Sequence, residues 1–218
     1  MKRILLSVVL LLLFSSFALR ESGELNLTKY VNPFIGTGGH GHTFPGATVP
    51  FGMVQLSPDT RLEGWDGCSG YHYSDSIIYG FSHTHLSGTG VPDYCDVLFM
   101  PFSENKLIDL DKSRIGNYTS QFSHSEETAE PGYYSVTLKR YGIKAELTTS
   151  TRAGFHKYTF PKDKNSNVFI DLKHRDEVIE SHISIVNRNE VSGFRRSNSW
   201  AHDQRVYFYA VFSEEFKT

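Results

Sequence analysis

Aromatic, histidine and carboxylate side chains crowd the stretch GWDGCSGYHYSDSIIYGFSHTHLSGTG, which spans residues 64–90. The residues that suit a sugar are Trp65, Tyr71 and Tyr73, with their flat rings, and the polar side chains of Arg61, Asp66, His83 and His85. An indole ring can stack on the apolar C–H face of a sugar, while carboxylates and imidazoles bind its hydroxyl groups. These residue types therefore indicate a polar ligand site that suits a carbohydrate.

Two His-x-His pairs, His40 with His42 and His83 with His85, offer a different chemistry. Residues two apart on a strand point to the same face, so each pair could place two imidazoles on one zinc ion. A third ligand would have to come from elsewhere in the fold. A zinc hydrolase therefore stays open as an alternative.

Glycoside hydrolysis needs two carboxyl groups, one as an acid and one as a base or nucleophile. The first half of the chain offers several carboxylates, namely Asp59, Glu63, Asp66, Asp75, Asp93 and Asp96. Their spacing marks no acid and base pair, and aspartate is common in turns for other reasons. The carboxylates alone therefore identify no catalytic pair.

The N-terminal segment and the net charge indicate where the protein is located and which partners it lacks. Lys2 and Arg3 precede an apolar run from residue 4 to residue 14, which predicts a secretory signal peptide over residues 1–18. The protein is then secreted or periplasmic, and no later segment is apolar enough to cross a membrane. A formal charge of -2 gives no basic surface for nucleic acid. In an oxidising compartment Cys68 and Cys95 could form a disulfide or stay as thiols, and the sequence leaves both possibilities open.

The elements that must position these residues are strands. From about residue 132 apolar residues alternate with polar ones, so that Tyr134, Val136 and Leu138 share one face. Turns are expected at Pro131-Gly132 and Tyr141-Gly142, and no helix exceeds a couple of turns. Further short strands are expected within residues 142–150, 155–160, 167–173, 182–186 and 205–212. The pattern predicts an all-β fold, an antiparallel β-sandwich with long loops rich in glycine, histidine and aromatic residues. Because the last strand runs to the end of the chain, we expect the sandwich to be incomplete.

Two long motifs and one short one are recognisable: YVNPFIGTGGHGHTFPGATVPFGMVQLSPDTR, GWDGCSGYHYSDSIIYGFSHTHLSGTGVPDYCDVLFMP and PGYYSVTL. They resemble the N-terminal domain of glycoside hydrolase family 92, a family of exo-acting α-mannosidases. The resemblance implies that residues 19–218 form an N-terminal β-sandwich, which packs on a C-terminal (α/α)6 barrel that this chain lacks. It also implies inversion at the anomeric carbon and dependence on calcium, with the general acid, the general base and the calcium ligands outside this chain.

The resemblance implies roles for the candidate residues as well. Trp65 is expected to stack on sugar. Asp66, Cys68, His83, His85 and Asp93 are expected to touch sugar or to build the interface with the barrel, and the Gly36–Gly46 loop is expected to lie nearby. The predicted function is that of the N-terminal domain of a secreted α-mannosidase of the α-1,2 type, acting on terminal mannose of N-glycans or mannan. The chain alone is expected to be inactive, and a stand-alone carbohydrate-binding module is the alternative.

Overall fold

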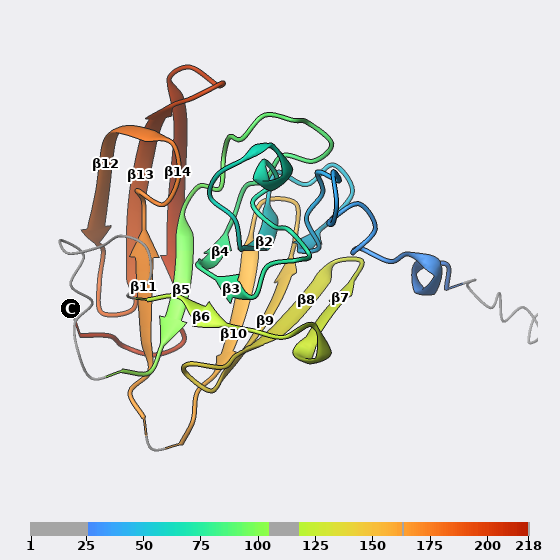
Figure 1. The fold of residues 1–218 in the computed structure, drawn as a ribbon. Helices are drawn as coiled ribbons and strands as arrows, with labels where there is room; N and C mark the ends of the chain where they lie inside the picture. The colour runs from blue at the N-terminus through green and yellow to red at the C-terminus, as the bar shows by residue number, and fades with distance from the viewer. Residues whose placement is uncertain (1–25, 105–117, 163, 218) are drawn as a thin grey trace, which may run out of the picture. The chain divides into compact units, whose positions relative to one another are not determined.

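We describe a computed structural model of the chain in which residues 26–104, 118–162 and 164–217 are placed (Figure 1). The predicted signal peptide, residues 1–18, lies outside the described residues. The chain divides into two compact units, residues 1–30 and residues 31–218. The first contains the short 3-10 turn η1 (Thr28–Tyr30), and every other element belongs to the second. None of the described residues forms a helix with the length and apolar character that a membrane span requires.

A five-stranded antiparallel sheet of order β1-β2-β4-β5-β11 forms the middle of the second unit. Its strands are β1 (Ala47–Thr48), β2 (Gln55–Asp59), β4 (Gly80–Ser82), β5 (Leu98–Phe102) and β11 (Asn167–Asp171). In β5, Leu98 and Met100 join one buried cluster and Phe99 joins another, because successive side chains of a strand point to opposite faces. This sheet therefore carries apolar side chains on both faces, and both faces are covered.

A four-stranded antiparallel sheet of order β10-β9-β8-β7 covers the first face. Its strands are β7 (Glu127–Glu130), β8 (Tyr133–Leu138), β9 (Ile143–Thr149) and β10 (Gly154–Thr159). Tyr134, Val136 and Leu138 enter the core together, as their alternation predicts, and there they join Leu56 and Leu98. Two sheets that share one apolar core form a sandwich, which confirms the predicted all-β class.

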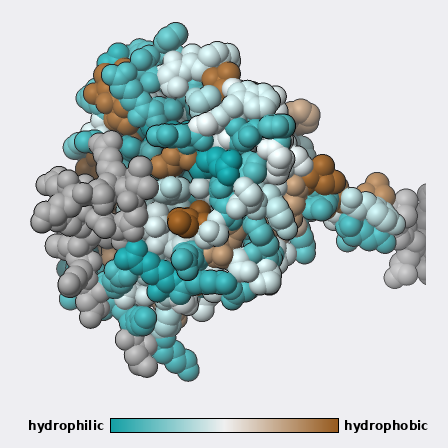
Figure 2. Space-filling model, in the orientation of Figure 1, coloured by the Kyte–Doolittle hydropathy of each residue, from teal (hydrophilic) through white to brown (hydrophobic). Residues whose placement is uncertain are grey.

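A three-stranded antiparallel sheet covers the second face of the five-stranded sheet and consists of β12 (Glu177–Ile185), β13 (Glu190–Asn198) and β14 (Gln204–Val211). Val206 and Phe208 of β14 pack towards Phe99, whereas Tyr207 and Tyr209 point outward and are exposed. In Figure 1 these strands carry the orange and red end of the colour scale. Figure 2 shows brown apolar patches scattered over this view of the molecule rather than one continuous area.

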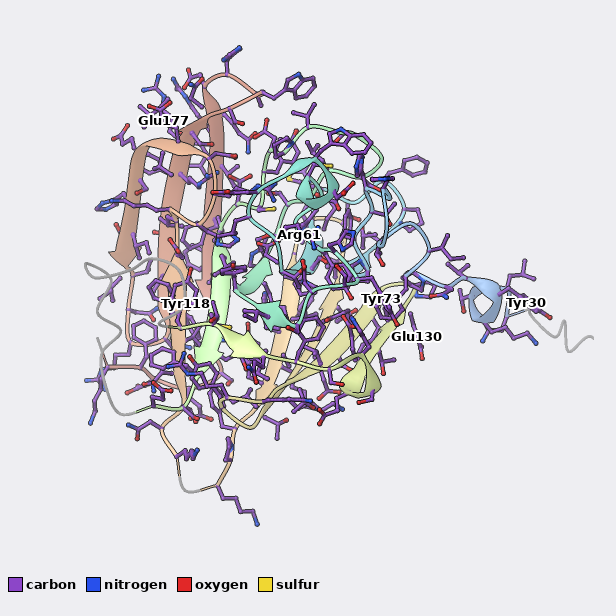
Figure 3. All side chains as sticks on the ribbon, viewed as in Figure 1. Tyr30, Arg61, Tyr73, Tyr118, Glu130 and Glu177 are labelled. Atoms are coloured by element: carbon purple, nitrogen blue, oxygen red, sulfur yellow. The ribbon has the colours of Figure 1, made fainter. Side chains whose placement is uncertain are left out.

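Long irregular segments join the strands of the first half, and three of them, residues 31–46, 60–76 and 83–97, form what we call the loop layer. They are tied to one another by backbone hydrogen bonds, such as Gly88 N to His42 O at 2.6 Å and Tyr73 N to Thr37 O at 2.8 Å. Figure 3 labels Arg61 and Tyr73 in this layer. Its regular elements are short: η2 (Trp65–Gly67), with β3 (Ile77–Ile78), β6 (Ser120–Gln121) and η3 (His124–Glu126) nearby in sequence or pairing.

Candidate functional site

Trp65 lies at the surface as the first residue of η2, and 58% of it is exposed. Gly64 before it has a φ of 87°, a conformation that glycine adopts without strain. The imidazole of His42 packs edge-on against the indole, with ring centroids 4.1 Å apart. Gly90 also lies against the ring, since a Cβ atom there would be 2.6 Å from the indole Nε1. Neighbouring residues therefore hold the indole, while more than half of it stays open to a ligand.

Asp66 places a carboxylate beside this aromatic face. Its Oδ1 accepts a hydrogen bond from His40 Nδ1 at 2.9 Å, and His42 Nε2 lies 3.9 Å from the same oxygen. The hydrogen bond from His40 lowers the pKa of Asp66 below its usual range. Both histidines belong to the Gly36–Gly46 loop, so the prediction that this loop lies near Trp65 is confirmed. An ionised hydrogen-bond acceptor and two imidazoles thus surround an exposed indole.

His83 lies under the loop layer and faces β10. Its Nδ1 donates to Val97 O at 2.7 Å, which leaves Nε2 to accept from His156 Nε2 at 3.0 Å. His156 Nδ1 in turn accepts from the Tyr158 hydroxyl at 2.6 Å. Burial lowers the pKa of His83 to about 4 and that of His156 well below its usual value, so both rings are neutral. The chain of hydrogen bonds joins the loop layer to β10.

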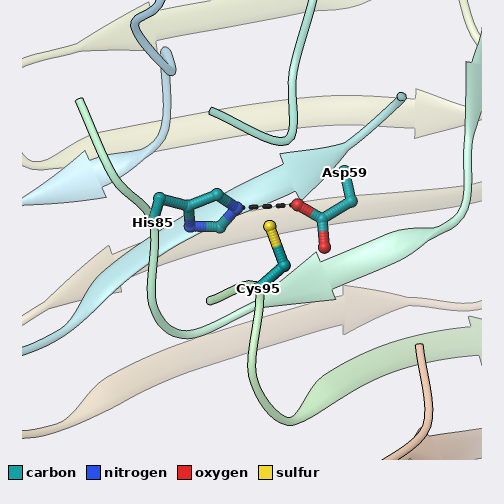
Figure 4. A group of neighbouring side chains, drawn as sticks. All are labelled: Asp59, His85 and Cys95. Carbon is teal, nitrogen blue, oxygen red and sulfur yellow. Dashed lines mark hydrogen bonds and ion pairs between the residues drawn. The ribbon is translucent and has the colours of Figure 1, made fainter. Parts of the chain in front are cut away.

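His85 points to a different place, a buried group with Asp59 and Cys95 that Figure 4 draws. His85 Nε2 donates to Asp59 Oδ1 at 2.7 Å, and Nδ1 donates to Gln55 O at 2.8 Å. Burial disfavours a charged imidazole, but the Asp59 carboxylate and Cys95 raise the pKa of His85 to about 10. Burial also opposes ionisation of Asp59, yet His85 and His174 lower its pKa overall. The group is therefore a buried imidazolium–carboxylate pair.

The same group is the one set of three or more histidine, cysteine and acidic side chains in the described part of the chain whose ligand atoms lie within 4.8 Å of one another. Nitrogen, sulfur and oxygen donors would suit zinc, whereas calcium prefers oxygen ligands. Both nitrogens of His85 are already bound to oxygen atoms, and Arg175 Nη1 lies 3.3 Å from Cys95 Sγ. Protonated imidazole and a neighbouring guanidinium oppose a cation, and the two His-x-His pairs contribute only His85 here.

The remaining predicted residues lie inside the protein. Cys68 is fully buried and its thiol is free, 3.9 Å from Thr89 O, and Cys95 is also a free, buried thiol. Asp93 is 1% exposed; its Oδ2 accepts from Ala201 N at 2.6 Å and its Oδ1 from Tyr94 N at 2.8 Å. The structure thus brings Trp65 and Asp66 together at the surface. It places Cys68, His85 and Asp93 in the support beneath them.

The sequence analysis missed several residues of this support. His174 Nε2 lies 2.9 Å from Asp59 Oδ2, and Arg175 Nη2 donates to Gly67 O at 3.2 Å. Both come from the segment between β11 and β12, more than a hundred residues after η2. The adjacent basic residues at positions 173–175 are the only local signal, and charged runs are usually solvated.

The chain resembles proteins of one known family. Residues 30–218 match the glycosyl hydrolase family 92 N-terminal domain. An uncharacterised secreted glycosidase of Arthroderma benhamiae is 31% identical over 163 residues, which make up 69% of this chain and 19% of that protein.

Solved structures also resemble the chain. A family GH92 α-mannosidase of Bacteroides thetaiotaomicron, in complex with mannoimidazole, is 40% identical with a TM-score of 0.80, over 87% of this chain and 25% of that one. An inverting GH92 mannosidase from the same species is 30% identical with a TM-score of 0.68, over 84% and 24%. The chain thus spans about a quarter of the length of these relatives. It belongs to glycosyl hydrolase family 92, of which it carries the N-terminal domain.

Proposed function

We propose that this chain is the sugar-recognising N-terminal part of a calcium-dependent, inverting exo-α-mannosidase. The substrates would be terminal α-linked mannose units of N-glycans or mannan, with α-1,2 linkages as the favoured type. Support comes from family membership and from the printed descriptions of solved relatives as α-mannosidases, one of them inverting and one in complex with mannoimidazole.

The observation that carries the proposal is the exposed indole of Trp65 with Asp66, His40 and His42 around it. A sugar presents an apolar C–H face and a rim of hydroxyl groups. Stacking on the indole would bury the face, and Asp66 would accept hydrogen bonds from the hydroxyls. His42 Nε2 is buried without a hydrogen-bond partner among the described residues. A small shift of its loop would let this nitrogen bind a sugar hydroxyl.

The catalytic acid and base, in this proposal, lie outside these 218 residues, in a C-terminal (α/α)6 domain of a longer protein. The relatives' roughly fourfold greater length supports this division. The same holds for calcium. The described residues offer a nitrogen- and sulfur-containing group rather than an oxygen cage, so they do not fit that ion and we derive no step through it.

The roles of Cys68, His83, His85 and Asp93 in sugar contact stay predictions. Their other expected role, in the interface with the barrel, also stays a prediction. In this chain each of them is engaged with atoms of the chain itself. Secretion is likewise part of the proposal. It is supported by the curated relative that is described as secreted.

The test is a titration of the chain with methyl α-D-mannopyranoside by isothermal calorimetry, comparing Trp65→Ala with Trp200→Ala. Trp200 is a matched control, since it is 66% exposed but lies in the β13–β14 turn. Loss of the stacking contact in Trp65→Ala should weaken affinity about tenfold, and Trp200→Ala should leave it unchanged. Equal affinity of both variants and the parent chain would refute the role of this surface.

A further inference from the structure

Arg175 is an arginine in the interior, 6% exposed, in the segment between β11 and β12. Arginine is rarely buried unless its charge is paired. Among the described residues no carboxylate lies at ion-pair distance from it. Its guanidinium instead donates from Nη1 to Cys95 Sγ at 3.3 Å and from Nη2 to Gly67 O at 3.2 Å. Both contacts reach residues of the loop layer.

The contact with Gly67 holds the turn that carries the sugar site. Gly67 ends η2, two residues after Trp65. A single 3-10 turn is not stable by itself, and Gly64, the residue that precedes η2, has no side chain to cap it. The orientation of the turn therefore depends on contacts from outside. Arg175 supplies one from 108 residues further along the chain.

The contact with Cys95 lies near Gly70, three residues after Gly67. Cys95 Sγ lies directly over Gly70, where an added Cβ would be 2.9 Å from the sulfur. Gly70 O is fixed as well, since it accepts from Thr60 N at 2.7 Å and from Arg61 N at 3.1 Å. One planar guanidinium thus contacts Gly67 directly and Cys95, whose sulfur lies against Gly70. A lysine ammonium lacks the fixed two-nitrogen fork, so it would reproduce this geometry only in part.

Arg175 is itself held by the three-stranded sheet. Arg195 of β13 donates from Nε to Leu172 O at 2.9 Å and from Nη2 to Arg175 O. The Arg195 guanidinium also pairs with the buried carboxylate of Asp96. A continuous line of contacts therefore runs from β13, through the backbone and guanidinium of Arg175, to η2.

We propose that Arg175 is a positioning residue, which fixes the turn bearing Trp65 and Asp66 in its sugar-binding orientation. The inference rests on the proposed function of that surface. Arg175 does not touch the ligand in this account. It acts through Gly67 and Cys95, so its loss should change the mobility of the indole as well as the affinity for sugar.

The experiment uses Arg175→Met and Arg175→Lys in a Trp200→Phe background, where Trp65 is the one remaining tryptophan of the two in the sequence. Two properties are measured: quenching of Trp65 fluorescence by acrylamide, and affinity for methyl α-D-mannopyranoside. Arg188→Met is the control, because Arg188 is exposed and pairs only with Glu215 at the surface. For Arg175→Met we expect more efficient quenching and about tenfold weaker affinity, the effect of one lost charge-assisted hydrogen bond. Arg175→Lys should recover part of both, and the control should change neither.

Unchanged quenching and affinity in a folded Arg175→Met variant would overturn the proposal. If that variant does not fold, Arg175→Lys decides, and parental values of both properties would overturn it equally. Trp65→Ala in the same series separates the two claims. If Trp65→Ala binds mannoside normally, the proposed function fails, whereas the quenching data still test the positioning role.

Discussion

Replacement of Asp176 by asparagine should stabilise the protein at neutral and alkaline pH. The side chain of Asp176 is 5% exposed and its Oδ2 lies 3.8 Å from Arg195 Nη2. With Lys173 and Glu177 it lines an open, polar pocket of about 250 Å³. Burial and the neighbouring Asp93 carboxylate raise the pKa of Asp176 from 3.8 to about 7. An amide resembles the protonated acid and needs no charge. Asparagine also tolerates the left-handed φ of 63° at this position.

The sign and size of the effect follow from the two pKa values. The folded state binds the proton more tightly than the unfolded state, so the stabilising effect of the proton is complete below pH 3.8 and is lost as the pH rises to about 7. A difference of about 3 pH units corresponds to at most ~4 kcal/mol. Because Asp176 is only partly enclosed, water screens part of this effect, so Asp176→Asn should match the parent near pH 4 and exceed its free energy of unfolding by ~1–2 kcal/mol at pH 8.

The assay is urea unfolding followed by tryptophan fluorescence at intervals from pH 4 to pH 8. All other ionisable groups are common to both proteins, so their contributions cancel in the difference between the two curves. A constant difference across the range, or a less stable variant at pH 8, would refute the raised pKa of Asp176.

Three further predictions concern the site and its support. Gly90→Ala should displace the Trp65 indole, because the new Cβ would lie 2.6 Å from Nε1, and should therefore weaken mannoside binding in a calorimetric titration. Gly88→Ala is the control: its Cβ would meet no atom within 4 Å, so it should keep the parental affinity despite the φ of 72° at this position. Cys68 and Cys95 should both react with a thiol reagent, but only after unfolding, and a chain with no reactive thiol in denaturant would contradict the free cysteines. The raised pKa of His85 adds stability that is complete below pH 6.5 and is lost as the pH approaches 10. His85→Gln should therefore lose less stability between these pH values, as measured by unfolding curves. An equal fall in the free energy of unfolding in the variant and the parent would count against the ion pair.

Much of the second half of the fold was predictable from its alternation. The core-facing side chains of β8 are those expected, Tyr134, Val136 and Leu138. The expected turns contain Gly132 and Gly142, whose positive φ values of 79° and 66° suit a turn. Strands in the first half were not predicted. β2 and β5 each contain a proline, at Pro58 and Pro101, which normally argues against a strand. Each proline pairs with one neighbouring strand only. Pro58 pairs with β4, because the pairing of β1 with β2 ends at Leu56. Pro101 pairs with β11, because β4 pairs with β5 only at Phe99.

The exposed part of the candidate site was also within reach of the sequence. Trp65 and Asp66 are adjacent, and the His40–His42 loop was expected beside them. The support beneath was not, because Asp59, His85, Cys95 and Arg175 come from four separate segments that only the folded sheets bring together. Local spacing cannot predict a buried ion pair of this kind. β13 was missed for a related reason: Arg195 is a fully buried arginine in a strand that reads as polar.

The most direct test of the account is release of mannose from a terminal α-mannoside by the 218-residue chain, measured with calcium and again with EDTA. The account predicts no release under either condition, because it places the catalytic acid, the catalytic base and the calcium ligands outside these residues. Calcium-dependent release of mannose by this chain would contradict it.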